Sequence, residues 1–222
     1  MGEEVVSPYL WSRGLKRLDV VALTHAHHDH LDGLHSVLEN FLVGELWIGR
    51  DEKTRAFQSL CEEARARGIT IVHLTGGARF DWQGVRGEVL WPPDSSPVRE
   101  ASNENSLVLR LSDGAVRFLL PGDIQQHVEE KLTRDGAPLA ADFVKVPHHG
   151  SKTSSTEDFV AAVAPRVAVI SVGEANSFGH PSQSVVERYE HSGVRLLRTV
   201  RDGAVTALTN GNSLAVHAFA ER

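Results

Sequence analysis

At three places along the chain, a short hydrophobic run ends directly in histidine or aspartate residues. The run 18–23 leads into Thr24-His-Ala-His-His-Asp-His30, 116–120 leads into Pro121-Gly-Asp123, and 143–146 leads into Pro147-His-His149. Short runs rich in Val and Leu are typical of buried strands. Three strand ends that each deliver His or Asp indicate one shared site, and the residue types indicate a site for two metal ions.

Between these runs, strands alternate with helices, which is typical of an α/β protein. Hairpins are predicted over 79–91 and 107–120. The pattern predicts helices over 5–15, 31–41, 52–67, 124–132, 156–163 and 184–191, and further strands over 45–48, 69–74, 167–172, 194–198, 204–208 and 214–218. The sequence shows no internal repeat, low-complexity segment or linker, so a single domain over residues 1–222 is predicted.

Composition excludes several classes of protein. With 23 Lys and Arg against 29 Asp and Glu, the net charge is −6, which does not suit a general nucleic-acid-binding surface. Any action on nucleic acid is therefore expected at a local site. A single cysteine, Cys61, excludes an internal disulfide and a cysteine-based zinc site. No run approaches the ~18 apolar residues of a membrane span, and residues 1–6 do not resemble a signal peptide.

Four histidines and one aspartate lie within residues 25–30. In an extended stretch, residues two apart face the same way, so His25 and His27 can share one ion. Asp29 and His30 lie where the chain turns into a helix and can serve a second ion. Imidazole nitrogen with carboxylate oxygen is the ligand mix of zinc, manganese or iron. The alternative is a solvated polar loop.

The later candidates differ in strength. Asp123 alone is a weak signal, because turns commonly carry Gly-Asp, whereas the pair His148-His149 at a strand end is rarer. His180, with Asn176 nearby, either belongs to a loop entering a helix or reaches the substrate to contact a phosphate or protonate the leaving oxygen. The hydroxyl-rich segment 151–155 precedes a predicted helix, where it can bind phosphate or simply cap the helix.

Together these motifs resemble the metallo-β-lactamase superfamily, and more closely the hydrolase domain of ComEC-type competence proteins, which take up DNA in bacteria. The resemblance extends from about residue 5 to about residue 206, and the matching stretches are 23–34, 103–109, 118–124, 144–151 and 176–181. It implies an αββα sandwich in which loops at strand ends hold the metals at one edge. It also implies two divalent ions, zinc or manganese, as cofactors.

The resemblance assigns roles position by position. His25 and His27 match ligands of the first ion, Asp29 and His30 match ligands of the second, and Asp123 matches the carboxylate that bridges both. One of the pair at 148–149 matches a further ligand. His149 is the preferred match, and the other ring, His148, is then expected to contact a phosphate or shuttle protons. The candidate substrate-binding residues are Asn105, Ser106, Ser151 and Asn176.

Two departures from the family pattern matter. Many superfamily hydrolases supply a third histidine to the first ion, but here Asn103, Asn105 and Ser106 stand before the Gly-Asp hairpin. This resembles the ComEC-like branch and argues against a glyoxalase or β-lactamase activity. In addition, a first N-terminal β-hairpin of the family is expected to be missing, which would leave an exposed sheet edge.

The resemblance therefore implies hydrolysis of a phosphodiester, with DNA as the substrate. Asp29 and Asp123 are expected to hold metal and orient the attacking hydroxide, with His180 as general acid. Two alternatives remain: a hydrolase for a small phosphoester or phosphocholine-type group, and a non-catalytic remnant of such a domain. By resemblance, the expected location is the extracytoplasmic face of a bacterial membrane, beside a DNA-uptake channel.

Overall fold

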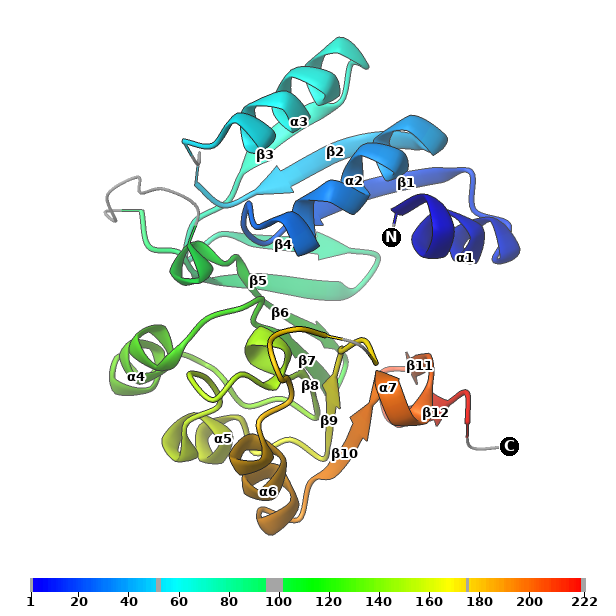
Figure 1. The fold of residues 1–222 in the computed structure, drawn as a ribbon. Coiled ribbons are helices and arrows are strands. Elements are labelled where there is room, and N and C mark those ends of the chain that lie inside the picture. Colours follow the sequence, from blue (N-terminus) through cyan, green and yellow to red (C-terminus); the bar gives the residue numbers. More distant parts are fainter. Residues whose placement is uncertain (1, 51–52, 95–101, 175, 221–222) are drawn as a thin grey trace. The chain divides into compact units, whose positions relative to one another are not determined.

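The computed structural model describes residues 2–50, 53–94, 102–174 and 176–220 (Figure 1). The chain divides into two compact units. Unit 1 comprises residues 1–75 and 92–107, and unit 2 comprises residues 76–91 and 108–222. Across the described ranges, no helix combines the length and the apolar character that a membrane crossing requires. The single domain over residues 1–222 stays a prediction.

Unit 1 is a parallel sheet with helices. Its strands follow the order β1-β2-β3, so β1 lies at one edge of this sheet. The elements are a π-helical turn (Gly2–Val6), α1 (Ser7–Ser12), β1 (Arg17–Leu23), α2 (His28–Asn40), β2 (Leu42–Ile48), α3 (Arg55–Ala66), β3 (Thr70–His73) and a 3-10 turn, η2 (Asn103–Asn105).

The core of unit 1 lies between the sheet and helices α2 and α3. Leu31 and Leu38, seven residues apart in α2, pack with Leu46 of β2 and Leu60 of α3, and all four are at most 1% exposed. This spacing places one apolar face of the helix on the sheet. The amphipathic helix predicted from residue 31 begins three residues earlier, at His28, so the polar cluster supplies its first turn.

Unit 2 contains a seven-stranded sheet with the order β10-β9-β8-β7-β6-β5-β4. Strands β4 to β7 pair antiparallel, whereas β7 to β10 pair parallel. The elements are β4 (Arg79–Trp82), β5 (Val85–Trp91), β6 (Val108–Asp113), β7 (Val116–Leu120), α4 (Gln126–Arg134), β8 (Phe143–Lys145), η3 (Pro147–Gly150), α5 (Glu157–Val163), β9 (Val167–Ile170), α6 (Gln183–His191), β10 (Arg195–Arg198), α7 (Thr199–Asp202), β11 (Val205–Thr209) and β12 (Leu214–Ala218).

Both faces of this sheet are partly covered. Helices α4, α5 and α6 bury Val128, Phe159 and Tyr189 against one face, each 0% exposed. The β11–β12 hairpin packs near β9 and β10, where Val169 and Leu197 join a separate small core. Figure 1 shows the three helices on the same side of the sheet. Because β7, β8 and β9 are parallel, their carboxyl ends meet at one edge.

The predicted strands and helices are confirmed, with boundaries that shift by a few residues. The predicted start of the helix 52–67, residue 52, lies outside the described residues. The short helical segments 147–150 and 199–202 were not predicted. In the first of these, His148 and His149 have φ of +46° and +53°, which is the left-handed region. Non-glycine residues rarely adopt this conformation, so sequence propensity gives no signal for it.

Candidate metal centre

In unit 1, the chain after β1 brings two histidine rings together. His27 keeps an extended backbone with φ −76° and ψ 150°, and His25 Nε2 lies 3.1 Å from His27 Nδ1. In a tetrahedral shell with metal–nitrogen bonds of 2.0–2.1 Å, two ligand nitrogens lie about 3.3 Å apart. The observed spacing therefore fits one divalent ion held between the two rings.

Hydroxyl groups contact the other nitrogen of His25. Thr24 Oγ1 lies 3.1 Å from His25 Nδ1 and 3.2 Å from His30 Nδ1, and Ser106 Oγ lies 3.3 Å from His25 Nδ1. Leu107 N donates to Thr24 O, which places Ser106 beside this ring. Such contacts orient a ring and leave its second nitrogen for a metal. The predicted substrate contacts of Ser106 and of its neighbour Asn105 stay predictions.

The first turn of α2 supplies the next two candidates. His30 Nε2 lies 3.7 Å from Asp29 Oδ2, and the rings of His25 and His30 have centroids 4.4 Å apart. Asp29 and His30 both offer atoms that could hold a metal ion. His28 instead lies exposed, with Nδ1 3.2 Å from Asp32 Oδ1. Three of the four clustered histidines, His25, His27 and His30, therefore lie close together, and their roles as ligands stay predictions.

In unit 2, the parallel strand ends assemble a second group. Asp123 follows β7, His149 follows β8, and Ser171 follows β9. His149 Nδ1 donates to Ser171 O at 2.7 Å, and Nε2 lies 3.3 Å from Asp123 Oδ2. A ring that donates one N–H to a carbonyl presents its other nitrogen to a metal. This arrangement supports His149, rather than His148, as the ligand of unit 2.

Lys145 is a member of this group that the sequence analysis missed. Its Nζ donates to Asp123 Oδ1 at 3.0 Å and to Gly122 O at 3.3 Å. Asp123 is only 2% exposed, and a buried carboxylate requires a compensating cation. A signal was available, because Lys145 lies inside the otherwise apolar run 143–146. Lys145 holds one carboxylate oxygen, while the other faces His149.

The charge state of the nearby rings follows from burial and from their neighbours. Burial lowers the pKa of His148 and of His180, and further lowering comes from nearby histidines, although Asp123 opposes it. Burial also disfavours charge on His149, but its bond to Asp123 raises the pKa of His149 above the ordinary value. The rings of His148 and His180, with centroids 5.5 Å apart, are therefore mainly neutral at pH 7.

The remaining candidates of unit 2 make local contacts. Asn176 Oδ1 accepts from His180 N and Asn176 Nδ2 donates to His180 O, both at 2.8 Å, so this amide fixes the backbone of the His180 turn. Ser151 is 5% exposed and its Oγ lies 3.0 Å from Thr153 Oγ1. Gln125 Nε2 lies 3.2 Å from His148 Nδ1. The substrate contacts predicted for Asn176 and Ser151 stay predictions.

Each unit thus carries imidazole nitrogens and carboxylate oxygens that suit a divalent ion of the zinc or manganese type. In unit 1 they come from the end of β1 and the start of α2. In unit 2 they come from the ends of β7 and β8, with Lys145 and Ser171 holding them. The convergence of the two groups on shared ions stays a prediction.

Comparison with known proteins gives relatives of the expected kind. The chain is 32% identical to ComE operon protein 3 of Bacillus subtilis over 212 residues, which is 92% of this chain and 26% of that protein. It is also 32% identical to competence protein ComA of Neisseria gonorrhoeae, covering 90% and 26%, and to recombination protein 2 of Haemophilus influenzae, covering 85% and 22%. The chain spans about a quarter of the length of these relatives.

Solved structures and a family model agree on the fold. The metallo-beta-lactamase fold protein YhfI of Bacillus subtilis has a TM-score of 0.52 at 13% identity, covering 87% of this chain and 80% of that one. CmlA of Streptomyces venezuelae, a diiron beta-hydroxylase, has a TM-score of 0.54 at 12% identity, covering 82% and 44%. These likenesses confirm the predicted fold class. Since residues 2–174, which include every candidate ligand, match the model of the metallo-beta-lactamase superfamily, the chain belongs to that superfamily.

Proposed function

We propose that this chain is a metal-dependent hydrolase that cleaves phosphodiester bonds, with DNA as its substrate. The observation that carries the proposal is the arrangement of His149, donating to Ser171 O and facing the buried carboxylate of Asp123. The pairing of His25 with His27 supports it from unit 1. The identity of the substrate rests on two of the relatives, whose names describe competence and recombination.

In this proposal, six side chains would hold two divalent ions, zinc or manganese: His25, His27, Asp29, His30, Asp123 and His149. Such ions supply stabilisation of charge on phosphate oxygens and lower the pKa of water. The chain itself contributes orientation. Thr24 and Ser106 fix the ring of His25, Ser171 fixes the ring of His149, and Lys145 holds Asp123. Asp29 and Asp123 would also accept hydrogen bonds from the attacking hydroxide.

His180 is the proposed contact to the reacting phosphate. A general acid must carry a proton, and burial lowers the pKa of His180, so at neutral pH its neutral ring donates a single N–H. Below neutrality the charged ring can also protonate the leaving oxygen. His148, whose ring lies against His180, can support either role. We therefore expect the contribution of His180 to catalysis to grow as the pH falls.

A second candidate function is hydrolysis of a small phosphoester or phosphocholine-type ester, since the same ligands serve any phosphate ester. Substrate breadth separates the two activities. A third candidate is a non-catalytic remnant of such a domain. The metal content of the purified protein tests it, because near two ions per chain supports an enzyme and none supports the remnant.

The competence relatives also lead us to propose action beside a membrane DNA-uptake channel, at the extracytoplasmic face.

The experiment that tests the proposal is a nuclease assay on purified protein, stripped with a chelator and titrated with Mn²⁺ or Zn²⁺. Labelled DNA and a nitrophenyl phosphodiester serve as substrates. Asp123→Asn and His149→Ala should each lose bound metal and hydrolysis while remaining folded. His127→Ala is the matched control, because His127 is exposed on α4 and belongs to neither ligand group. Full activity and unchanged metal content in Asp123→Asn would contradict the assignment.

A further inference from the structure

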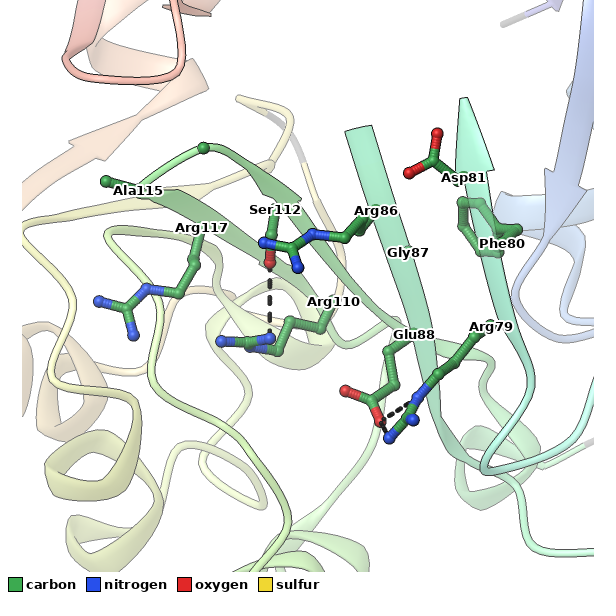
Figure 2. Close-up of a pocket in the computed structure, with 11 residues that line it drawn as sticks. Arg79, Phe80, Asp81, Arg86, Gly87, Glu88, Arg110, Ser112, Ala115 and Arg117 are labelled. Atoms are coloured by element: carbon green, nitrogen blue, oxygen red, sulfur yellow. Dashed lines mark hydrogen bonds and ion pairs between the residues drawn. The ribbon is translucent and has the colours of Figure 1, made fainter. Parts of the chain in front are cut away.

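Unit 2 carries a second polar site, away from the carboxyl ends of β7 and β8 that hold Asp123 and His149. A hollow of about 880 Å³ opens on strands β4 to β7, and four arginines line it: Arg79, Arg86, Arg110 and Arg117. We call it the arginine hollow. Figure 2 shows the guanidinium groups of Arg86 and Arg110 beside Ser112, with Arg117 further along the same hollow and Arg79 turned toward Glu88. None of these residues belongs to the candidate metal ligands.

The strand register explains why these side chains gather. Arg86 of β5 pairs with Ser112 of β6, which pairs with Arg117 of β7. In the next row, Glu88 pairs with Arg110, which pairs with Leu119. Paired residues of neighbouring antiparallel strands point to the same face, so the four arginines share one face of the sheet. Leu119, in the second row, is buried in the core that includes residues of α4, α5 and α6, whereas Arg86, in the first row, is exposed. This face of the sheet is therefore covered at Leu119 and open at Arg86.

Carboxylates neutralise only part of the positive charge, because two acidic residues, Asp81 and Glu88, line the hollow beside four arginines. Asp81 lies opposite Arg86 in the β4–β5 register. Arg79 Nη2 lies 2.8 Å from Glu88 Oε1. Arg117 Nε lies 3.7 Å from Asp142 Oδ2, which is too far for a hydrogen bond. The buried Nε of Arg117 has no hydrogen-bond partner among the described residues. Arg86 makes no side-chain hydrogen bond or ion pair within the described part of the chain.

The charges in the hollow also repel one another. Arg110 Nε donates to Ala140 O at 3.3 Å, and Nη1 donates to Ser112 Oγ at 3.5 Å, so neutral atoms are its hydrogen-bond acceptors. Burial lowers the pKa of Arg110, and repulsion from Arg117 and Arg86 lowers it further, while Glu88 opposes this. An anion placed among the three guanidinium groups would relieve that repulsion. In a chain of net charge −6, this local excess of positive charge is a distinct feature.

We propose that the arginine hollow binds the phosphate backbone of a nucleic acid strand. The planar fork of arginine matches phosphate oxygens with two parallel hydrogen bonds, and several arginines in a row suit a ligand with repeated negative charge. The choice of nucleic acid rests on the proposed function. Backbone contacts of this kind do not depend on base sequence, so the hollow anchors a strand without selecting its sequence.

The hollow and Asp123 lie toward opposite ends of β7, so a long strand can reach both more readily than a small substrate. Arg117 and Asp123 are six residues apart on β7 and the turn that follows it, so they lie at most about 20 Å apart at roughly 3.3 Å per residue. With about 3.4 Å of rise per nucleotide, roughly six nucleotides cover that length. The hollow should therefore affect the KM of a long strand and leave a nitrophenyl phosphodiester unaffected.

The test measures binding without cleavage. A chelator is added to prevent metal-dependent cleavage, and binding of a labelled single-stranded oligonucleotide is followed by fluorescence anisotropy. The proteins compared are the wild type, Arg86→Gln, and the double variant Arg86→Gln/Arg110→Gln. The double control Arg134→Gln/Arg166→Gln removes the same charge from exposed positions elsewhere in unit 2. We expect the double variant to bind at least about tenfold more weakly. Its salt slope should fall by about 1.4, because each phosphate contact to a single strand contributes about 0.7.

Several outcomes would overturn the proposal. One is wild-type affinity in the double variant, and another is an equal loss in the control. A third is binding of anionic lipid vesicles that depends on Arg86 while oligonucleotide binding does not. Because Arg86 is exposed and makes no side-chain bond among the described residues, Arg86→Gln alone keeps the fold and should show part of the effect.

The assay also separates this proposal from the proposed function. With metal restored, the double variant should raise KM for a long strand, keep kcat, and hydrolyse a nitrophenyl phosphodiester at the wild-type rate. If the wild type hydrolyses neither substrate yet binds the strand through Arg86 and Arg110, the proposed function fails and the hollow stands. If hydrolysis is normal and oligonucleotide binding does not depend on these arginines, only the proposal for the arginine hollow is contradicted.

Discussion

Glu129 of α4 is a buried acid that connects α4 to the start of α5. It is 0% exposed, and its carboxylate accepts from Ser155 N at 2.5 Å and from Thr156 N at 2.7 Å. Ser155 has a φ of +59°, an unfavourable conformation for serine that these bonds help to hold. We therefore expect Glu129 to stabilise the segment that follows His149.

The informative change is Glu129→Gln, which keeps the size of the side chain but replaces one acceptor oxygen with an NH2 donor. One buried backbone N–H then loses its acceptor, which costs about 1–3 kcal/mol of unfolding free energy. For a protein of this size, this lowers Tm by roughly 2–12 °C. Urea unfolding followed by circular dichroism measures the difference. Glu130→Gln is the control, because exposed Glu130 bonds Gln126 within the same helix and should change stability by less than ~0.5 kcal/mol.

The pH dependence gives a second readout. Burial raises the pKa of Glu129 above its ordinary value of 4.5, against the opposing hydrogen bonds from Thr156 and Ser155. The folded protein therefore keeps this proton at a pH where the unfolded chain has lost it. The resulting stability is fully present below pH 4.5 and is lost as the pH rises through the folded pKa. The gap between wild type and Glu129→Gln should narrow from pH 4.5 to neutrality. A constant gap, or a Glu129→Gln variant as stable as Glu130→Gln, refutes the reasoning.

Three further changes test the site and the fold. His180→Ala should leave metal content unchanged and lower turnover on DNA by ~10²–10⁴-fold. If the ring acts as an acid, the loss of turnover should be smaller on a nitrophenyl phosphodiester, whose leaving group needs no proton. An equal loss on both substrates indicates that the ring acts in substrate binding. Thr24→Val removes the hydroxyl beside His25 and His30 and should weaken metal affinity about 10–100-fold in a competitive chelator titration. Ala164→Gly should raise the free energy of unfolding by about 1 kcal/mol, seen as a higher urea midpoint, because this residue ends α5 with a φ of +45°.

The strand ends were predictable because hydrophobic runs and simple alternation carry the information. The runs before Thr24, Pro121 and Pro147 are strands, and His25 and His27 lie side by side as residues two apart in an extended stretch should. Such patterns are local, so a sequence contains them in full. The role of His25 and His27 as metal ligands depends on partners from other elements and stays a prediction.

The rest of the site depends on pairings that no local pattern reveals. The carbonyl of Ser171 meets His149 because β8 and β9 pair in parallel with Lys145 opposite Val169. Ser106 reaches His25 because Leu107 N donates to Thr24 O, more than eighty residues earlier in the chain. In both cases the partner comes from tertiary register, so composition and periodicity cannot identify it.

The backbone of His148 and His149 links stability to the proposed chemistry. Their φ values of +46° and +53° cost about 1–2 kcal/mol each, and such strain persists only where the surroundings over-determine it. Ser154, 2% exposed, donates to Pro147 O and Ser151 O on either side of the pair, and Glu129 holds the residues just beyond. These contacts lie away from Asp123, yet they keep His149 Nε2 turned toward it. Glu129→Gln should therefore weaken metal binding as well as stability, because relaxation of this strained turn would rotate the ring of His149 away from Asp123.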